Sequence, residues 1–271
     1  MIVFEWVAGN GAPANLTNIN PLLAQGVLAG AMPLSQFTGL NADSGTIVYA
    51  AGRDFDSGTR VSQLAESGIS VFGGVQQVQP IITGGSAGTA SATMSGLQLW
   101  PAATVLGQAF AIGNSGFASG GTLADNLATP GSGTANTTTG IPAAQQLAFG
   151  PGFLVGYLGR NDAARACKTS VIAGNTARRL TWNGAADWNG TTFTSAGVPT
   201  GGYNDAAVQE GLYSLWEYEW LAYRTTIPAN PKAVADAIAA RIINFDATVS
   251  GIKLSTMNVS KPVEGGLITH L

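Results

Sequence analysis

Apolar residues fall into short runs separated by turn-forming residues, a pattern that predicts alternating strands and helices. Residues 1–8 (MIVFEWVA) predict a buried strand, which the turn sequence GNG ends. Residues 46–51 and 153–158 predict two further strands. Strands that alternate with helices through the first third of the chain favour an α/β protein with a partly parallel sheet.

Capping residues followed by apolar positions at helical spacing predict three helices. Asn20 is expected to cap the first, with Pro21 in its first turn and Gly30 at its end. Ser57 is expected to cap the second, which Gly68 ends. The third helix has the clearest pattern, formed by Asn230, Pro231, Val234, Ile238 and Ile242.

Gly, Ser and Thr dominate residues 83–96, 113–142 and 172–204, which predicts three loop insertions at the surface. A short helix is expected within the second, after Ser119-Gly120-Gly121, and a β-excursion within the third.

Residues 210–224 (EGLYSLWEYEWLAYR) are ambiguous between helix and strand, although their five aromatic residues suit a strand. Such a group is more often core packing than a sugar-stacking platform. Glu217 and Glu219 would share one face of a strand, a geometry that could suit glycoside hydrolysis, but no other feature supports that activity.

Composition excludes several classes of protein. The 271 residues are 45% apolar with a net charge of −3 and no basic run, so a nucleic-acid binder is not expected. No apolar stretch approaches the roughly 18 residues of a spanning helix. Cys167 is the only cysteine and His270 the only histidine, which excludes an intrachain disulfide and a histidine metal site. A histidine-assisted nucleophile would require His270 to fold back into a site. We therefore expect no enzyme activity and no cofactor.

The stretch GRDFDSGTR, residues 52–60, concentrates charge in a chain that is otherwise nearly uncharged. It joins a predicted strand to a predicted helix, where free backbone N–H groups and the helix dipole favour an anion. Ser57, Gly58 and Thr59 would offer hydroxyl and N–H donors, and Arg53 a planar guanidinium. In the alternative interpretation, Ser57 is an ordinary cap and Arg53 pairs with a neighbouring aspartate. A nucleotide loop at GNG is not favoured, because the full glycine pattern is missing.

The order Arg-x-x-x-Ser-Gly-Thr after an apolar strand resembles the phosphate-binding proteins of ABC-type uptake systems, which are type 2 periplasmic binding proteins. Residues 18–21 (NINP), 116–121 (GFASGG) and 155–157 (VGY) resemble other segments of that family in matching order. The resemblance also favours a strand at residues 210–224. It implies that Arg53, Ser57, Gly58 and Thr59 contact phosphate, and that the protein is periplasmic or extracellular.

The resemblance further implies two lobes joined by hinge strands. Residues 1–225 would form lobe two with the hinge, and residues 226–271 the returning C-terminal part of lobe one. The family has half of lobe one ahead of the strand that residues 1–8 resemble, so the first lobe would be incomplete. Three expectations follow: the chain is a fragment, or a cleaved N-terminal piece stays bound, or neighbouring copies cover the open edge.

One position departs from the family pattern. Phe55 stands where the family has an acidic residue that accepts a proton from phosphate, with Asp54 and Asp56 on either side. The sequence thus predicts a module that holds a tetrahedral oxyanion, most simply phosphate. The alternative is a structural or interaction subunit of an extracellular assembly, with a vestigial anion site.

Overall fold

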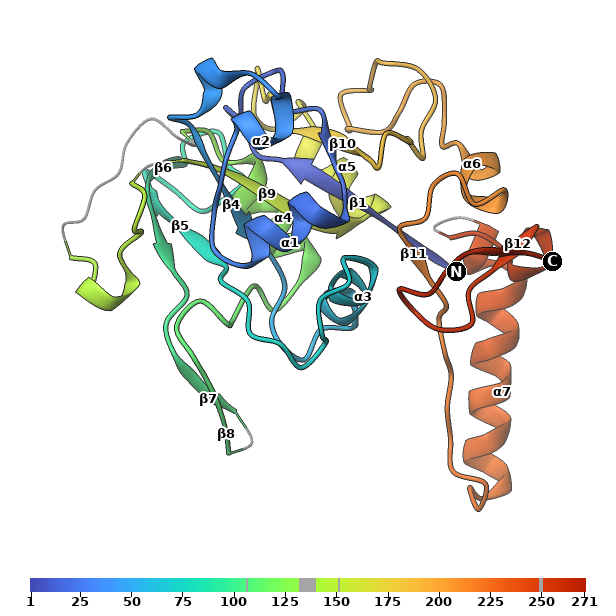
Figure 1. The fold of residues 1–271 in the computed structure, drawn as a ribbon. Coiled ribbons are helices and arrows are strands. Elements are labelled where there is room, and N and C mark those ends of the chain that lie inside the picture. Colours follow the sequence, from blue (N-terminus) through green and yellow to red (C-terminus); the bar gives the residue numbers. More distant parts are fainter. Residues whose placement is uncertain (106, 132–139, 151, 249–250) are drawn as a thin grey trace.

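The protein has a mixed α/β fold, which confirms the predicted class (Figure 1). The computed structural model describes residues 1–271 except 106, 132–139, 151 and 249–250. Its main sheet is curled like half a barrel and has the strand order β2-β10-β1-β9-β4-β3. These strands are β1 (Ile2–Ala8), β2 (Asn18–Ile19), β3 (Met32–Pro33), β4 (Ile47–Ala51), β9 (Gly152–Gly159) and β10 (Arg178–Trp182).

The sheet is partly parallel, as expected. β4 pairs with β9 and β2 with β10 in parallel, whereas β1 pairs antiparallel with both β9 and β10. Strand alternation sends Leu154 and Leu158 of β9 to one face and Val155 and Tyr157 to the other, and both faces are buried.

Helices cover the two faces of the sheet. α4 (Gly120–Ala128) and α5 (Arg160–Cys167) pack on one face, and α1 (Pro21–Leu28) on the other. Asn20 caps α1 as predicted, because its side chain accepts a hydrogen bond from Leu23 N. The remaining helices are α2 (Ser35–Thr38), α3 (Gly58–Glu66), α6 (Asp205–Gln209) and α7 (Ala229–Asn244), with 3-10 turns at Asn41–Asp43, Ala143–Gln145, Asp246–Thr248 and Leu254–Thr256.

Three small two-stranded sheets flank this core. They are formed by β5 (Val78–Thr83) with β6 (Thr93–Leu99), β7 (Ala103–Val105) with β8 (Gln108–Phe110), and β12 (Val259–Ser260) with β13 (Thr269–His270). The loop predicted at residues 83–96 is shorter than expected, because the strand β6 already begins at Thr93. Most of the sequence GSGTANTTTG in the second insertion lies outside the described residues.

The C-terminal part of the molecule joins the main sheet through the first residues of β1. β11 (Trp216–Glu217) pairs antiparallel with Ile2 and Val3, and residues 218–224 continue beyond it as an extended segment without a ladder. The expected strand over residues 210–224 is therefore wrong except at β11. The predicted third helix is confirmed as α7, and it projects away from the main body (Figure 1). Among the described residues, none of the helices has the length and apolar character required to cross a membrane.

Candidate anion site at two helix N-termini

The loop after β4 and the loop before α4 run side by side. Asp54 N donates to Phe117 O at 3.0 Å, and Phe117 N donates to Gly52 O at 2.8 Å. Gly116 makes this approach possible, because a Cβ there would lie 2.3 Å from Arg53 O. The pairing brings the start of α3 and the start of α4 together.

Arg53 holds the second loop through its side chain. Its Nε donates to Phe117 O at 3.1 Å and its Nη2 to Ala118 O at 3.0 Å. Within the described part of the chain, Arg53 makes no ion pair with Asp54 or Asp56, contrary to the simpler interpretation of its sequence. The other N–H groups of the half-buried guanidinium have no protein acceptor among the described residues, so one edge of the fork is free.

Ser57, Gly58 and Thr59 lie at the first turn of α3, as predicted. Ser57 occupies the N-cap position, but its side chain makes no capping bond, so that part of the prediction is wrong. Its Oγ is buried in a residue only 6% exposed and has no hydrogen-bond partner in the structure. No described residue accepts a hydrogen bond from the N–H of Gly58 or Thr59. A Cβ on Gly58 would meet no atom within 4 Å, so the space on that side of Gly58 is open.

The first turn of α4 is occupied differently. Ser119 caps it by accepting a hydrogen bond from Thr122 N at 3.1 Å. The Asp162 carboxylate of α5 lies against the same turn, because a Cβ on Gly120 would be 2.0 Å from Asp162 Oδ2. Burial raises the pKa of Asp162, while the positive charges of Arg53 and Arg165 oppose that rise. The protein therefore supplies its own anion to α4.

The acidic neighbours of Arg53 are also placed. Asp54 Oδ1 accepts hydrogen bonds from Phe55 N at 2.8 Å and from Ser115 Oγ at 3.1 Å. Phe55 stacks on Phe110 with ring centroids 4.0 Å apart, which gives the phenyl ring a packing role. Asp56 is exposed.

Buried polar side chains that sequence reasoning missed fix the loop before α4. Arg60 donates from Nη1 to Asn114 O at 3.1 Å and from Nη2 to Asn114 Oδ1 at 2.5 Å. Gln77 Nε2 donates to Ser115 O at 2.7 Å and to Arg53 O at 3.1 Å. These contacts tie α3 and the loop after β4 to the loop before α4.

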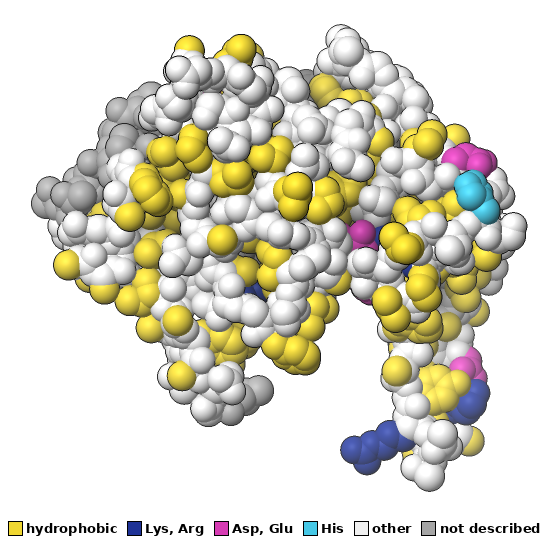
Figure 2. All heavy atoms as spheres, in the orientation of Figure 1, with side chains coloured by type: hydrophobic (Ala, Val, Ile, Leu, Met, Phe, Trp, Pro, Cys, Tyr) yellow, Lys and Arg dark blue, Asp and Glu magenta, His cyan; other side chains and the backbone are white. Residues whose placement is uncertain are grey.

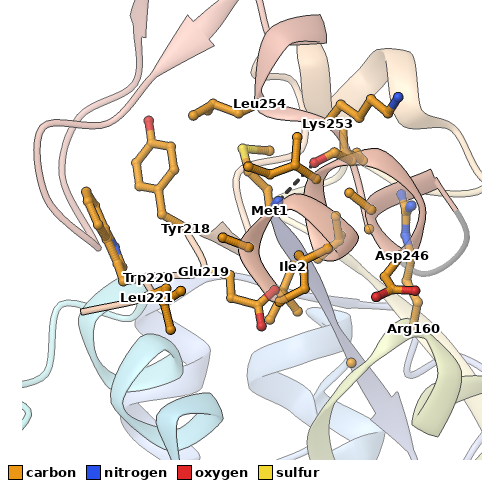
Figure 3. Close-up of a pocket in the computed structure, with 18 of the residues that line it drawn as sticks. Met1, Ile2, Arg160, Tyr218, Glu219, Trp220, Leu221, Asp246, Lys253 and Leu254 are labelled. Atoms are coloured by element: carbon orange, nitrogen blue, oxygen red, sulfur yellow. Dashed lines mark hydrogen bonds between the residues drawn. The ribbon is translucent and has the colours of Figure 1, made fainter. Parts of the chain in front are cut away.

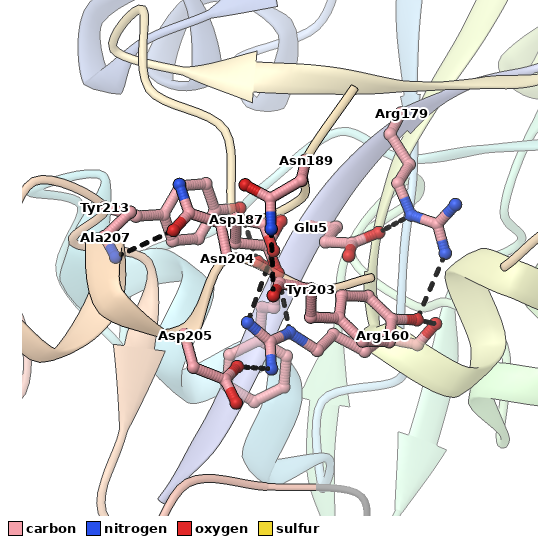
Figure 4. A network of polar contacts seen from close by, with 11 residues as sticks. Glu5, Arg160, Arg179, Asp187, Asn189, Tyr203, Asn204, Asp205, Ala207 and Tyr213 are labelled. Carbon is pink, nitrogen blue, oxygen red and sulfur yellow. Dashed lines mark hydrogen bonds and ion pairs between the residues drawn. The ribbon is translucent and has the colours of Figure 1, made fainter. Parts of the chain in front are cut away.

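A second charged cluster joins the start of α5 to β1 and to residues after β10 (Figure 4). Arg160 binds Asp187 at 2.7 Å and Asp205 at 2.6 Å, and Arg179 pairs with Glu5 of β1. Burial raises the pKa of Glu5 well above its ordinary value, and the nearby Asp187 charge raises it further. The cluster ties the excursion after β10 to the sheet. Glu5, Arg160, Arg179 and Asp187 are buried, so we assign it a structural role.

The other sequence candidates lie apart from Arg53. Glu217 is on β11, where burial and the charge of Glu264 raise its pKa to about 8, while Glu219 is exposed. Asn10 of the GNG turn donates to Ala128 O at 2.8 Å, a structural contact at the end of α4. The aromatic residues of 210–224 differ in exposure. Trp216 is buried, as expected for core packing, whereas Trp220 is 79% exposed, as a stacking platform would require.

Comparison of the chain with models of known protein families, with curated proteins and with solved structures found no match. No cluster of three or more metal-binding side chains occurs in the described ranges.

Proposed function

We propose that this protein is a binding module that holds a small tetrahedral oxyanion, with inorganic phosphate as the first ligand to test, at the N-terminus of α3. The supporting observation is the set of unused donors there. Ser57 Oγ is buried without a partner, and the adjacent N–H groups of Gly58 and Thr59 are free. A buried hydroxyl left unpaired costs about 1–3 kcal/mol, which a bound acceptor would recover.

Arg53 would supply the positive charge. Its Nε and Nη2 bonds to Phe117 O and Ala118 O orient the guanidinium, leaving the other edge for a bidentate contact. The exposed Asp56 carboxylate beside the site would favour an anion that carries a proton, and so hydrogen phosphate over sulfate. Binding requires no bond breaking, and we propose a non-enzymatic role in solute binding outside the cytoplasm, on a two-lobed fold of the periplasmic binding protein kind.

Thermal unfolding at constant ionic strength tests this proposal. Phosphate at about one hundred times its Kd would raise the unfolding free energy by about 2.7 kcal/mol, whereas chloride would not raise it. Arg53→Gln should remove the increment that phosphate produces, even if it lowers the Tm without ligand. Sulfate should stabilise less than phosphate.

Arg241→Gln is the matched control. Arg241 is an exposed arginine on α7, away from α3, that forms an ion pair with Asp246 at 3.6 Å, so it reports the general effect of removing one charge. This variant should keep the phosphate increment. The proposal fails if wild type shows no increment at millimolar phosphate, or if both variants lose it equally.

A second function, as a structural or interaction subunit, is favoured by a different observation. None of the sixteen residues of α7 is buried, although the helix carries several large apolar side chains. A helix with this composition usually buries at least one face.

A further inference from the structure

The loop after β12 joins the C-terminal part of the molecule to the C-terminal end of α3. This loop, residues 261–266, reaches toward α3 (Figure 1). Its Gly265 N–H donates to Glu66 Oε1 at 2.9 Å. A Cβ on Gly265 would lie 2.2 Å from Ala65 O, and its φ of +72° favours glycine, so the close approach depends on that residue. The contact lies above the notch that separates α7 from the body (Figure 2).

Lys261 lies at the centre of this contact. Its side chain has no exposed surface, and its Nζ forms an ion pair with Glu66 Oε1 at 2.6 Å. The same Nζ donates to the backbone O of Ser214 at 2.7 Å and of Trp216 at 2.9 Å, and it lies 4.2 Å from the centre of the Trp216 ring. The three oxygen acceptors match the three N–H groups of an ammonium.

The same loop holds the backbone on both sides of Glu217. Lys261 bonds to the carbonyl of Trp216, the residue before it. Glu264 Oε1 accepts a hydrogen bond from the N–H of Tyr218, the residue after it, at 3.1 Å. Tyr218 Oη in turn accepts a hydrogen bond from Lys261 N at 3.1 Å. The Glu217 carboxyl of β11 is therefore fixed next to the loop.

Carboxyl groups outnumber basic groups in this part of the described structure. The charges of Glu66, Glu264 and Glu217 all act on the amine of Lys261. Among the described residues, no group donates a hydrogen bond to the half-buried Glu217 carboxyl, and Glu264 Oε2 is buried without a partner. Since Glu66 already neutralises Lys261, an ionised Glu217 would be a partly buried charge beside like charges.

The titration of Glu217 agrees with this geometry. Burial raises its pKa to about 8, and acidic neighbours add to the rise while a basic one opposes it, in the order Glu264, Glu219, Glu66 and Lys261. Glu219 acts from the other side, where it is exposed and lines a cavity of about 1030 Å³ (Figure 3). Burial also raises the pKa of Glu66 and lowers that of Lys261. At neutral pH the closed contact therefore carries a proton on Glu217.

We propose that residues 261–266 are a proton-dependent latch, which is closed on α3 and β11 while Glu217 carries its proton and opens more readily once that proton is lost. An open latch exposes the Glu217 carboxyl to water, where its ordinary pKa is about 4.3. Opening therefore releases a proton between about pH 4.3 and pH 8, and it becomes easier as pH rises through that window. Above it, the carboxyl is ionised in both states. The latch does not depend on the anion site.

Hydrogen exchange of the full chain, followed by mass spectrometry, tests this proposal. The amides of Tyr218, Lys261 and Gly265 are the reporters, because each donates a hydrogen bond in the closed latch. Glu217→Gln mimics the protonated carboxyl at every pH, so its latch should stay closed. The ratio of exchange in wild type to exchange in this variant, measured at the same pH, should rise at least about tenfold between pH 5 and pH 8 and then level off.

Two comparisons make the test specific. Asp236→Asn removes an exposed carboxylate from α7, outside the latch, and should keep the wild-type profile. The amides of Trp6–Ala8 in β1 should stay protected throughout, because they report opening of the whole domain. A constant ratio of wild type to Glu217→Gln across this pH range would overturn the proposal. So would a pH-dependent loss of protection in β1 as large as that at the latch.

Discussion

The starts of α3 and α4 have similar sequences but different surroundings. Both begin with Ser-Gly at the N-cap and first turn, and the pairing of their preceding loops places them side by side. Ser119 makes its capping bond and Asp162 lies against its helix, whereas the buried Ser57 hydroxyl makes no such bond and has no hydrogen-bond partner. A Ser-Gly helix start thus becomes a candidate ligand site only when the protein does not fill it.

The largest expected effect comes from separating the two helix starts. Gly116→Ala would place a Cβ 2.3 Å from Arg53 O and 2.5 Å from Gly52 O, both backbone atoms that cannot move independently. We expect a loss of about 3 kcal/mol in unfolding free energy, measured by chemical denaturation.

Gly58→Ala is the control for that substitution, because its Cβ would meet no atom within 4 Å. We expect its stability to stay within about 1 kcal/mol of wild type. Equal losses in the two variants would mean that the close approach at Gly116 does not determine how the loops pair.

An intermediate effect is expected from exchanging the two serines for alanine. Ser119→Ala removes a capping bond and should cost about 1 kcal/mol of stability. Ser57→Ala removes a hydroxyl that has no partner, so it should leave the stability without ligand unchanged or slightly higher, while reducing stabilisation by phosphate. Thermal unfolding with and without phosphate measures both. A loss of stability in Ser57→Ala without ligand would show that the two helix starts are equivalent after all.

The smallest effect concerns Asp162. Asp162→Asn removes a negative charge near Arg53 and should strengthen phosphate binding about three- to tenfold, since a unit charge at this range contributes about 1 kcal/mol in a water-exposed setting. Calorimetric titration measures the change, and unchanged affinity would show that the two helix starts do not interact.

The pH dependence of stability provides an independent test of Asp162. Its pKa is raised in the folded protein, mainly by burial, so the folded state keeps the proton to higher pH than the unfolded chain. Its contribution to stability is therefore greatest below the ordinary pKa near 3.9 and declines as pH rises through the raised value. Asp162→Asn should lack this decline. A parallel pH profile in the two proteins would contradict the placement of the carboxylate.

Local sequence patterns predicted the elements that depend on local chemistry. The cap of α1, the short helix α4 after Ser119-Gly120-Gly121 and the strands β1, β4 and β9 were predicted, because capping and apolar periodicity act over a few residues. The predicted strand at residues 210–224 was mostly wrong because a strand needs a neighbour, and only β11 has one. The two-lobed arrangement and the phosphate ligand remain proposals.

The surroundings of the site could not be predicted in the same way. Asp162 reaches α4 because α5, which follows β9, packs beside α4 on the same face of the sheet, a relation between distant segments that no local pattern contains. The buried pair of Glu5 with Arg179 was likewise not predicted, because its two residues lie on strands that are far apart in the sequence.

The strand β1 has a consequence for how amide hydrogens exchange with solvent. Its residues Trp6–Ala8 are paired on both sides, with β9 and β10, so their amides should exchange only when the whole domain opens. Ile2 and Val3 are paired only with β11, next to the extended residues 218–224. The limit between a slowly and a rapidly exchanging region therefore falls inside one continuous strand, near Phe4, rather than at a loop.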